Sequence, residues 1–315
     1  MALRQVLDII ELLDRPTIAG ADVVELFAAR GLADIELTPV ATDLGSTTFV
    51  KFVVPGRQGQ SQGGAAPTLG LIGFLGGVGA RPAVVGLVSD GDGAVTSLAA
   101  GLKLVDMYRV GDQLAGDVIV ATHLSPNAPV IPHEPVPFMG SPVSVGEMCQ
   151  QLVDDRMAAI LAVDTTKGNR IINHRGFAIS PTIKEGYVLR VSDDLLTIQQ
   201  NVTGRLPAVF AVATQDITPY GNGLFHLNSI LQPATATAAP VVGVAITTET
   251  AVPGSASGAS HAVDIELAAR FVIEVAKAYT DGRARFYDAE EFTRLVSLYG
   301  SMGHLQTLGK GGSDE

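Results

Sequence analysis

The sequence predicts an α/β fold in which a twisted, largely parallel sheet carries helices on both faces. Apolar runs broken at most by glycine are typical of parallel strands that are buried on both sides. Four such runs, at residues 69–75, 118–121, 157–163 and 241–246, alternate with helical patterns. The 315 residues, 47% of them hydrophobic, can bury a sizeable core. We expect one domain over residues 1–308 and a flexible, glycine-rich tail over 309–315.

The first third of the chain predicts two helices and then a strand pair. Apolar residues recur at helical spacing from Leu3 to Leu13, and a second helix covers about 21–29. Runs rich in Val, Phe and Thr predict strands at 35–40 and 47–54. A further apolar run, 83–88, leads through Ser89-Asp90-Gly91-Asp92-Gly93 into an amphipathic helix.

The remaining elements follow a proline-rich passage at 125–142, where the prolines exclude helix and most strand. A connection of that length inside a compact domain is usually functional. Beyond the strand at 157–163, the sequence predicts strands at 176–191 and 209–213 and helices that begin near Ser192, Asp264 and Asp288. A short helix is also expected at 145–155.

Composition excludes several classes of partner. The net charge is -11, no basic cluster occurs and aromatic residues make up only 5%, which argues against binding nucleic acid or an anionic membrane. Cys149 is the only cysteine, so neither an intrachain disulfide nor a multi-thiolate metal site is expected. Without a signal peptide or a bilayer-spanning run, the expectation is a cytoplasmic protein. The high mean hydropathy, +0.31, predicts a homo-oligomer.

Acidic and imidazole side chains follow the predicted strands. Asp90, His123 and Asp164 each come just beyond an apolar run, and His261 ends the loop that follows another. The carboxyl ends of parallel strands form one rim, where ligands collect. Two carboxylates and two imidazoles at that rim would suit zinc, manganese or cobalt, and zinc is expected first.

Each of these four residues also has a structural interpretation. An aspartate after a strand is most often a turn or helix-cap residue, so Asp90 could cap a turn unless Asp92 is the cap. His261 could hydrogen-bond the first turn of the following helix, and His123 could be a buried, hydrogen-bonded histidine. Asp164 could anchor the Thr-Thr-Lys turn that follows it.

Other polar residues lie in the predicted loops around this rim. Glu134 or Asp216 could be a general base, and Lys167 could be the base or nucleophile of a metal-independent reaction. The remaining residues could bind the substrate, although the histidines among them could equally be surface residues: His133, Thr165, Thr166, His174, Arg175, Asn222 and His226.

These motifs resemble those of the two-metal aminopeptidase superfamily, particularly its glutamyl and tetrahedral branch. SDGDGAV, residues 89–95, is similar to the turn that holds the bridging aspartate, which places Asp90 there. LAVDTTKGN and SGASHAVDIELAARF are similar to the segments with the later ligands, here Asp164 and His261. The resemblance implies a zinc-aminopeptidase-like fold, a bound divalent metal and hydrolysis of amide bonds.

The chain departs from that superfamily at two motifs. Its first His-x-Asp falls near Gly73-Phe74-Leu75-Gly76, and its Glu-Glu pair falls where this chain reads Thr122-His123-Leu124. His123 is therefore considered as a replacement ligand. Over nearly the full length, phrases such as GFAISPTIKEGY, AVATQDITPYGNG and LNSILQPATAT resemble the uncharacterised domain-of-unknown-function family 1177.

The sequence thus favours a metal-dependent hydrolase of amide bonds in a small peptide-like or cyclic amide substrate. The alternative is a metal-free, peptidase-like scaffold that binds a small molecule or a partner. Phe74, near the place of the missing first histidine, favours the alternative, whereas the many polar loop residues favour the enzyme.

Overall fold

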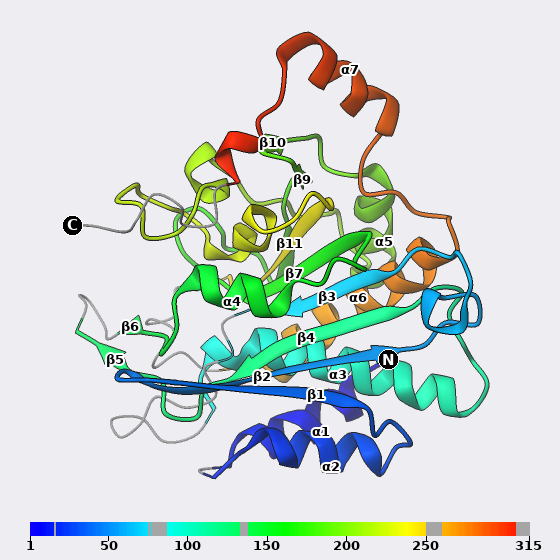
Figure 1. Ribbon diagram of the computed structural model, residues 1–315, viewed down its shortest axis with the longest axis vertical. Helices are drawn as coiled ribbons and strands as arrows, with labels where there is room; N and C mark the ends of the chain where they lie inside the picture. Colours follow the sequence, from blue (N-terminus) through cyan, green and yellow to red (C-terminus); the bar gives the residue numbers. More distant parts are fainter. Residues whose placement is uncertain (16, 75, 77–86, 133–137, 250–259, 307–315) are drawn as a thin grey trace.

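The computed structural model describes residues 1–15, 17–74, 76, 87–132, 138–249 and 260–306. These residues form a nine-stranded sheet (Figure 1). From edge to edge it contains β1 (Ile35–Thr42), β2 (Gly45–Val54), β4 (Val118–Leu124), β3 (Leu69–Gly73), β7 (Ala159–Thr165), β11 (Val241–Thr247), β9 (Ile183–Lys184) and β10 (Tyr187–Val188). β8 (Gly176–Ile179) also pairs with β11, and β5 (Val130–Ile131) pairs separately with β6 (Phe138–Met139).

The centre of the sheet is parallel and its edges are antiparallel. β4, β3, β7 and β11 run in one direction, whereas β1, β2, β8 and β9 pair antiparallel to their neighbours. The four parallel strands coincide with the four apolar runs, and all their residues except Thr165 are buried. The predicted α/β fold is thereby confirmed.

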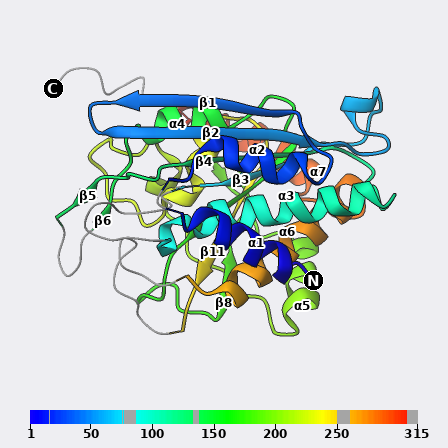
Figure 2. The ribbon, with the colours of Figure 1, turned by 90° about the horizontal axis from the view of Figure 1, so that it is seen from below.

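Helices cover both faces of the sheet. One apolar core lies under α1 (Leu3–Leu13), α3 (Asp92–Arg109), α5 (Asp193–Thr203) and α6 (Ala262–Thr280), with α2 (Gly20–Ala28) packed on β2. Figure 2 shows α1, α3 and α6 side by side. A second core lies under α4 (Val145–Leu152) and the 3-10 segments η3 (Thr214–Ile217) and η4 (Ser229–Thr235). Along β3, Leu71 faces the first core and Ile72 the second, as the alternation of a strand requires.

The last described helix, α7 (Ala289–Tyr299), projects from the body of the molecule (Figure 1) and contains no buried residue. Asp288 caps it by accepting hydrogen bonds from the amides of Glu290 and Glu291. No helix in the described part of the chain is both long and apolar enough to cross a bilayer.

Three sequence predictions differ from the observed elements. The segment 176–191 forms three short strands, because Glu185 and Gly186 both take positive φ, 48° and 79°, and turn the chain between β9 and β10. The stretch 209–213 forms only an isolated bridge, between Val209 and Ile179. Within the run 83–88, Leu87 and Val88 are not in a strand and 83–86 lie outside the described residues, as does the tail.

Candidate functional site

The carboxyl ends of β3 and β7 meet the start of α3. A Cβ at Gly93 would lie 2.6 Å from the carbonyl oxygen of Val163 and 2.7 Å from that of Phe74. Only glycine therefore lets the first turn of α3 pack this closely on the two strand ends. The packing brings Asp90, in the single turn η2 (Ser89–Gly91) that precedes α3, close to Asp164 near the end of β7.

Asp90 and Asp164 are buried carboxylates whose negative charges have few neighbouring groups to stabilise them. Asp90 is 6% exposed and Asp164 is 3% exposed. Burial raises the pKa of both carboxyl groups well above the usual range. The charge of Asp92 raises the pKa of Asp90 further, and the charge of Asp90 raises that of Asp164 further. Asp164 accepts hydrogen bonds from the Thr165 amide (2.6 Å) and the Ser229 hydroxyl (3.4 Å). Among the described residues, neither carboxylate has an ion-pair partner.

Asp92 is the hub of a buried polar network beside this pair. Its Oδ2 accepts a hydrogen bond from Lys167 Nζ at 2.8 Å and its Oδ1 accepts one from the Ser260 hydroxyl at 2.5 Å. The Asp92 side chain is 0% exposed and that of Lys167 5%. Asp92 therefore does not cap α3, whose N-cap is Gly91, but joins three distant segments of the chain. The sequence pattern predicts Asp92 only as a cap, and no local signal indicates this role.

His261 lies at the edge of the same cluster. It is the N-cap residue of α6, its Nδ1 is 3.3 Å from Asp264 Oδ2 and its side chain is half exposed. Its charge lowers the pKa of Asp92, which burial raises more strongly, so the imidazole is close enough to act on the network. Both of its interpretations, ligand and helix-terminal residue, are compatible with this position.

Both ring nitrogens of His123 are engaged in hydrogen bonds. Nε2 accepts from the Gly76 amide at 2.8 Å, so Nδ1 carries the proton and donates to Thr47 Oγ1 at 2.9 Å. A Cβ at Gly76 would collide with the His123 carbonyl oxygen, so only glycine permits this approach. Burial lowers the pKa of His123 to about 4. The alternative of a buried, hydrogen-bonded histidine therefore describes His123 in this structure.

We expect His123 to make the protein less stable in mild acid. A folded-state pKa of about 4, against 6.5 when exposed, gives a stabilisation that is complete above pH 6.5 and is lost as the pH falls toward 4. Its full size is about 3 kcal/mol. Urea unfolding between pH 7 and pH 4 should show this loss in the parent and in a His304→Gln control, which changes an exposed histidine, but not in His123→Gln. Equal pH slopes in all three proteins would contradict the assignment.

A cleft of about 340 Å³ opens beside these residues. Asp90, His123 and Ser229 line it together with the apolar side chains of Met139, Val143, Val145, Met148 and Tyr220. The cleft is therefore lined on one side by Asp90 and by Ser229, whose hydroxyl donates to Asp164, and otherwise largely by apolar side chains.

The other predicted loop residues divide into two groups. Asp216 is fully buried, and the amides of Ala213, Leu227 and Asn228 all donate to its carboxylate, which holds the loop around residues 213–228. His226 and Asn222 belong to that loop: His226 contacts the Tyr220 ring, and Asn222 donates to Thr218 Oγ1.

Lys167, Thr165 and Thr166 directly follow Asp164, and the buried Thr165 hydroxyl finds no hydrogen-bond partner among the described residues. His174 and Arg175 are exposed. His133 and Glu134 lie outside the described residues, so their roles remain predictions.

One detail of the predicted rim needs correction. His123 and Asp164 lie within the last two residues of β4 and β7 and not beyond the strands, because the ladders to β2 and β11 continue past the apolar runs. In addition, the described ranges contain no group of three or more His, Cys, Asp or Glu side chains placed to hold a metal ion. The carboxylate pair is thus the centre of the candidate site.

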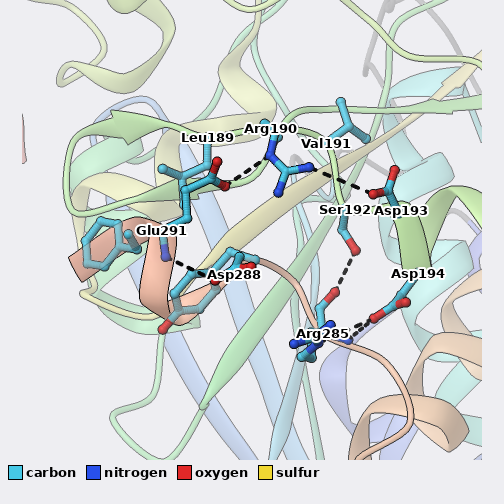
Figure 3. A pocket seen from close by; sticks show the side chains of 11 residues that line it. Leu189, Arg190, Val191, Ser192, Asp193, Asp194, Arg285, Asp288 and Glu291 are labelled. Carbon is cyan, nitrogen blue, oxygen red and sulfur yellow. Dashed lines mark hydrogen bonds and ion pairs between the residues drawn. The ribbon is translucent and has the colours of Figure 1, made fainter. Parts of the chain in front are cut away.

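A separate surface pocket lies between α5 and α7 (Figure 3). Its charged side chains pair with one another: Arg190 with Glu291 and Asp193, and Arg285 with Asp194. It contains none of the predicted site residues, and its ion pairs connect α7 to the segment around α5. We therefore assign it no role in chemistry.

Comparison with known proteins yields one family and a recognisable fold. A sequence model described as "Protein of unknown function (DUF1177)" matches residues 38–309. No curated protein sequence matches the chain. The bottromycin maturation enzyme BotP is similar in structure, with a TM-score of 0.54 and 17% identity over 90% of this chain and 70% of BotP.

Two further solved structures share the fold. BotP in complex with Mn has a TM-score of 0.50 and 16% identity, and the match covers 89% of this chain and 71% of that one. An Acidobacteriales bacterium glutaminyl cyclase has a TM-score of 0.51 and 13% identity, over 89% of this chain and 94% of the cyclase. These likenesses confirm the zinc-peptidase-like fold that the sequence motifs predicted.

Proposed function

Because the chain belongs to the DUF1177 family, for which no function is described, we propose a function from its site. The proposal is a metal-dependent hydrolase of amide bonds in a small peptide-like or cyclic amide substrate. The observation that carries it is the pair Asp90 and Asp164, two buried carboxylates with no cation beside them among the described residues. Burial raises the pKa of both, and the Asp90 charge raises that of Asp164 further.

The donor set fits a divalent metal. A cation between the two carboxylates would offset both the burial of their charges and their mutual repulsion. Carboxylate oxygens suit manganese, and an imidazole such as that of His261 would extend the choice to zinc or cobalt. The likeness of fold to BotP, a structure of which is in complex with Mn, supports the same choice.

In this proposal Asp90 and Asp164 would hold the metal, and the half-exposed His261 side chain would have to move to become a third ligand, because the described ranges contain no ready group of three. A bound divalent metal supplies Lewis acidity and lowers the pKa of water. The Ser229 hydroxyl orients the Asp164 carboxylate, and the ion pair of Lys167 with Asp92 fixes the first turn of α3 and with it Asp90. The amides that engage Asp216 leave Glu134 as the better candidate for the general base.

The alternative, a metal-free scaffold that binds a small molecule, is favoured by His123. Ligation by this residue would require Nε2 to release the Gly76 amide or Nδ1 to release Thr47. The scaffold hypothesis predicts that chelators change nothing.

Titration with Mn²⁺ distinguishes the two functions. We expect the parent and an Asp43→Asn control, which changes an exposed loop aspartate, to bind Mn²⁺. Asp164→Asn and Asp90→Asn should weaken that binding at least tenfold, because each removes a charged ligand, roughly 1.4 kcal/mol or more. Hydrolysis of a panel of dipeptides and cyclic dipeptides should require the metal and stop with EDTA. Equal Mn²⁺ binding by all four proteins would favour the scaffold.

A further inference from the structure

We propose that the cleft beside Asp90 is a specificity pocket for one uncharged, apolar side chain of leucine or methionine size. The substrate would then be an amide whose residue next to the scissile bond carries such a side chain. This inference rests on the proposed function for the bond that is cleaved, but binding of the side chain needs no metal.

The lining of the cleft selects against charge. Val145 and Met148 come from α4, which packs against η4 and β2, and Met139 comes from β6. No lysine, arginine or glutamate is among the described residues that line it, and Asp90 is the only carboxylate. A charged side chain against the apolar wall would lose its water, and the only carboxylate of the lining that a cation could pair with is Asp90, beside which the amide lies in this proposal.

The shape of the cleft suits a flexible, unbranched or γ-branched side chain. Its volume of about 340 Å³ accommodates a side chain together with part of the backbone that carries it. Met139 and Met148 are both buried and contribute thioethers, which adapt to the shape of an apolar ligand. In this proposal the amide lies beside Asp90 and the Ser229 hydroxyl, and the apolar side chain lies on the wall of Met139, Val145 and Met148. The lining also contains four other polar residues: His123, Ser125, Ser141 and Ser144.

The loop that contributes Tyr220 extends the apolar surface. The same loop exposes Leu224 and Phe225, the latter at 79%. Because the Asp216 carboxylate binds three amides of this loop, the loop presents these side chains from a fixed backbone.

Binding of capped amino acid amides tests the pocket. The probes are N-acetyl-L-leucinamide, N-acetyl-L-methioninamide, N-acetylglycinamide and N-acetyl-L-lysinamide, measured by ligand-observed NMR with EDTA-treated protein and again with Mn²⁺. We expect the leucine and methionine compounds to bind about tenfold tighter than the glycine compound in both states, because the pocket buries their methylene groups. The lysine compound should bind no better than the glycine compound.

Two substitutions at Val145, a half-buried residue of the lining, sharpen the test. Val145→Trp fills the cleft and should abolish the preference for leucine, whereas Gln150→Trp, on the exposed side of the same helix, should retain it. Val145→Asp should weaken binding of the leucine compound and strengthen that of the lysine compound.

Equal binding of the glycine and leucine compounds would contradict the proposed specificity pocket. An unchanged preference for the leucine compound in both Val145 variants would contradict it as well. Failure of the proposed function would be distinct: Mn²⁺ would neither bind nor support hydrolysis, while the leucine preference of the EDTA-treated protein persisted.

Discussion

Replacing Asp90 or Asp164 by asparagine should make the metal-free protein more stable at neutral pH, although most substitutions of buried residues destabilise. Each carboxylate is buried without a cation among the described residues. Burial raises the pKa of both, the Asp92 charge raises that of Asp90 further, and the Asp90 charge raises that of Asp164 further. Asparagine removes the charge and keeps the shape. We expect a gain of more than about 1 kcal/mol, since one pKa unit corresponds to about 1.4 kcal/mol.

The pH dependence of this gain follows from the direction of the pKa shift. A carboxyl whose folded-state pKa is raised contributes stability below its unfolded pKa, near 3.8, and loses that contribution as the pH rises through the folded value. The advantage of the asparagine variants should therefore be absent near pH 4 and grow toward pH 7. Addition of Mn²⁺ should reverse the order, because only the parent gains from binding.

Urea unfolding in EDTA and in Mn²⁺, at pH 4 and pH 7, provides the measurement. Asp193→Asn is the matched control, because the Asp193 side chain is 86% exposed. If Asp90→Asn and Asp164→Asn both lowered the stability of the metal-free protein at pH 7, the burial of the two charges would be offset by other contacts, and the metal proposal would lose its main support.

Asp92→Ala should be the most damaging single substitution in the network. It would leave the Lys167 ammonium buried, with a side chain only 5% exposed, and without its carboxylate. Breaking a buried ion pair in this way typically costs about 3–5 kcal/mol. The exposed pair of Arg190 with Asp193 offers the comparison: Asp193→Ala should change the stability by less than about 1 kcal/mol.

The double variant Asp92→Leu/Lys167→Met distinguishes the cost of an unpaired buried ammonium from the cost of losing the ion pair itself. Replacing both members of a buried pair by apolar residues is often neutral, so we expect it to recover most of the stability lost by Asp92→Ala. Its Mn²⁺ affinity should remain low, because the first turn of α3 that carries Asp90 has lost its tie to the loop after β7. Equal stability of the single and double variants would show that the ion pair has no special weight.

The central fold could be predicted from the sequence because its parallel strands are buried on both faces and therefore appear as unbroken apolar runs. Capping residues likewise predicted where helices begin. An example is Ser192, whose hydroxyl accepts a hydrogen bond from the Leu195 amide. The strand predicted at 209–213 is wrong, because burial of an apolar residue there does not extend into a strand. Phe210 is buried in the second core and its amide donates to Ile179, but no strand ladder continues from there.

The candidate site was predictable to the extent that topology determines it. Asp90 and Asp164 come together because the ends of parallel strands share one edge of the sheet. The pairing of Asp92 with Lys167 was not predictable, because no local pattern shows which aspartate of Asp-Gly-Asp-Gly meets a lysine 75 residues away. The same holds for His123, whose state depends on the Gly76 amide.

The contacts of Asp92 also determine when the site can form during folding. Lys167 lies 75 residues from Asp92 along the chain, and Ser260 lies 168 residues from it. Contacts at such separations require closure of long loops, which is slow and opposed by chain entropy. No fragment that ends before Ser260 can assemble the complete network, and in a nascent chain that ends before Lys167 the Asp92 carboxylate has neither of these two partners.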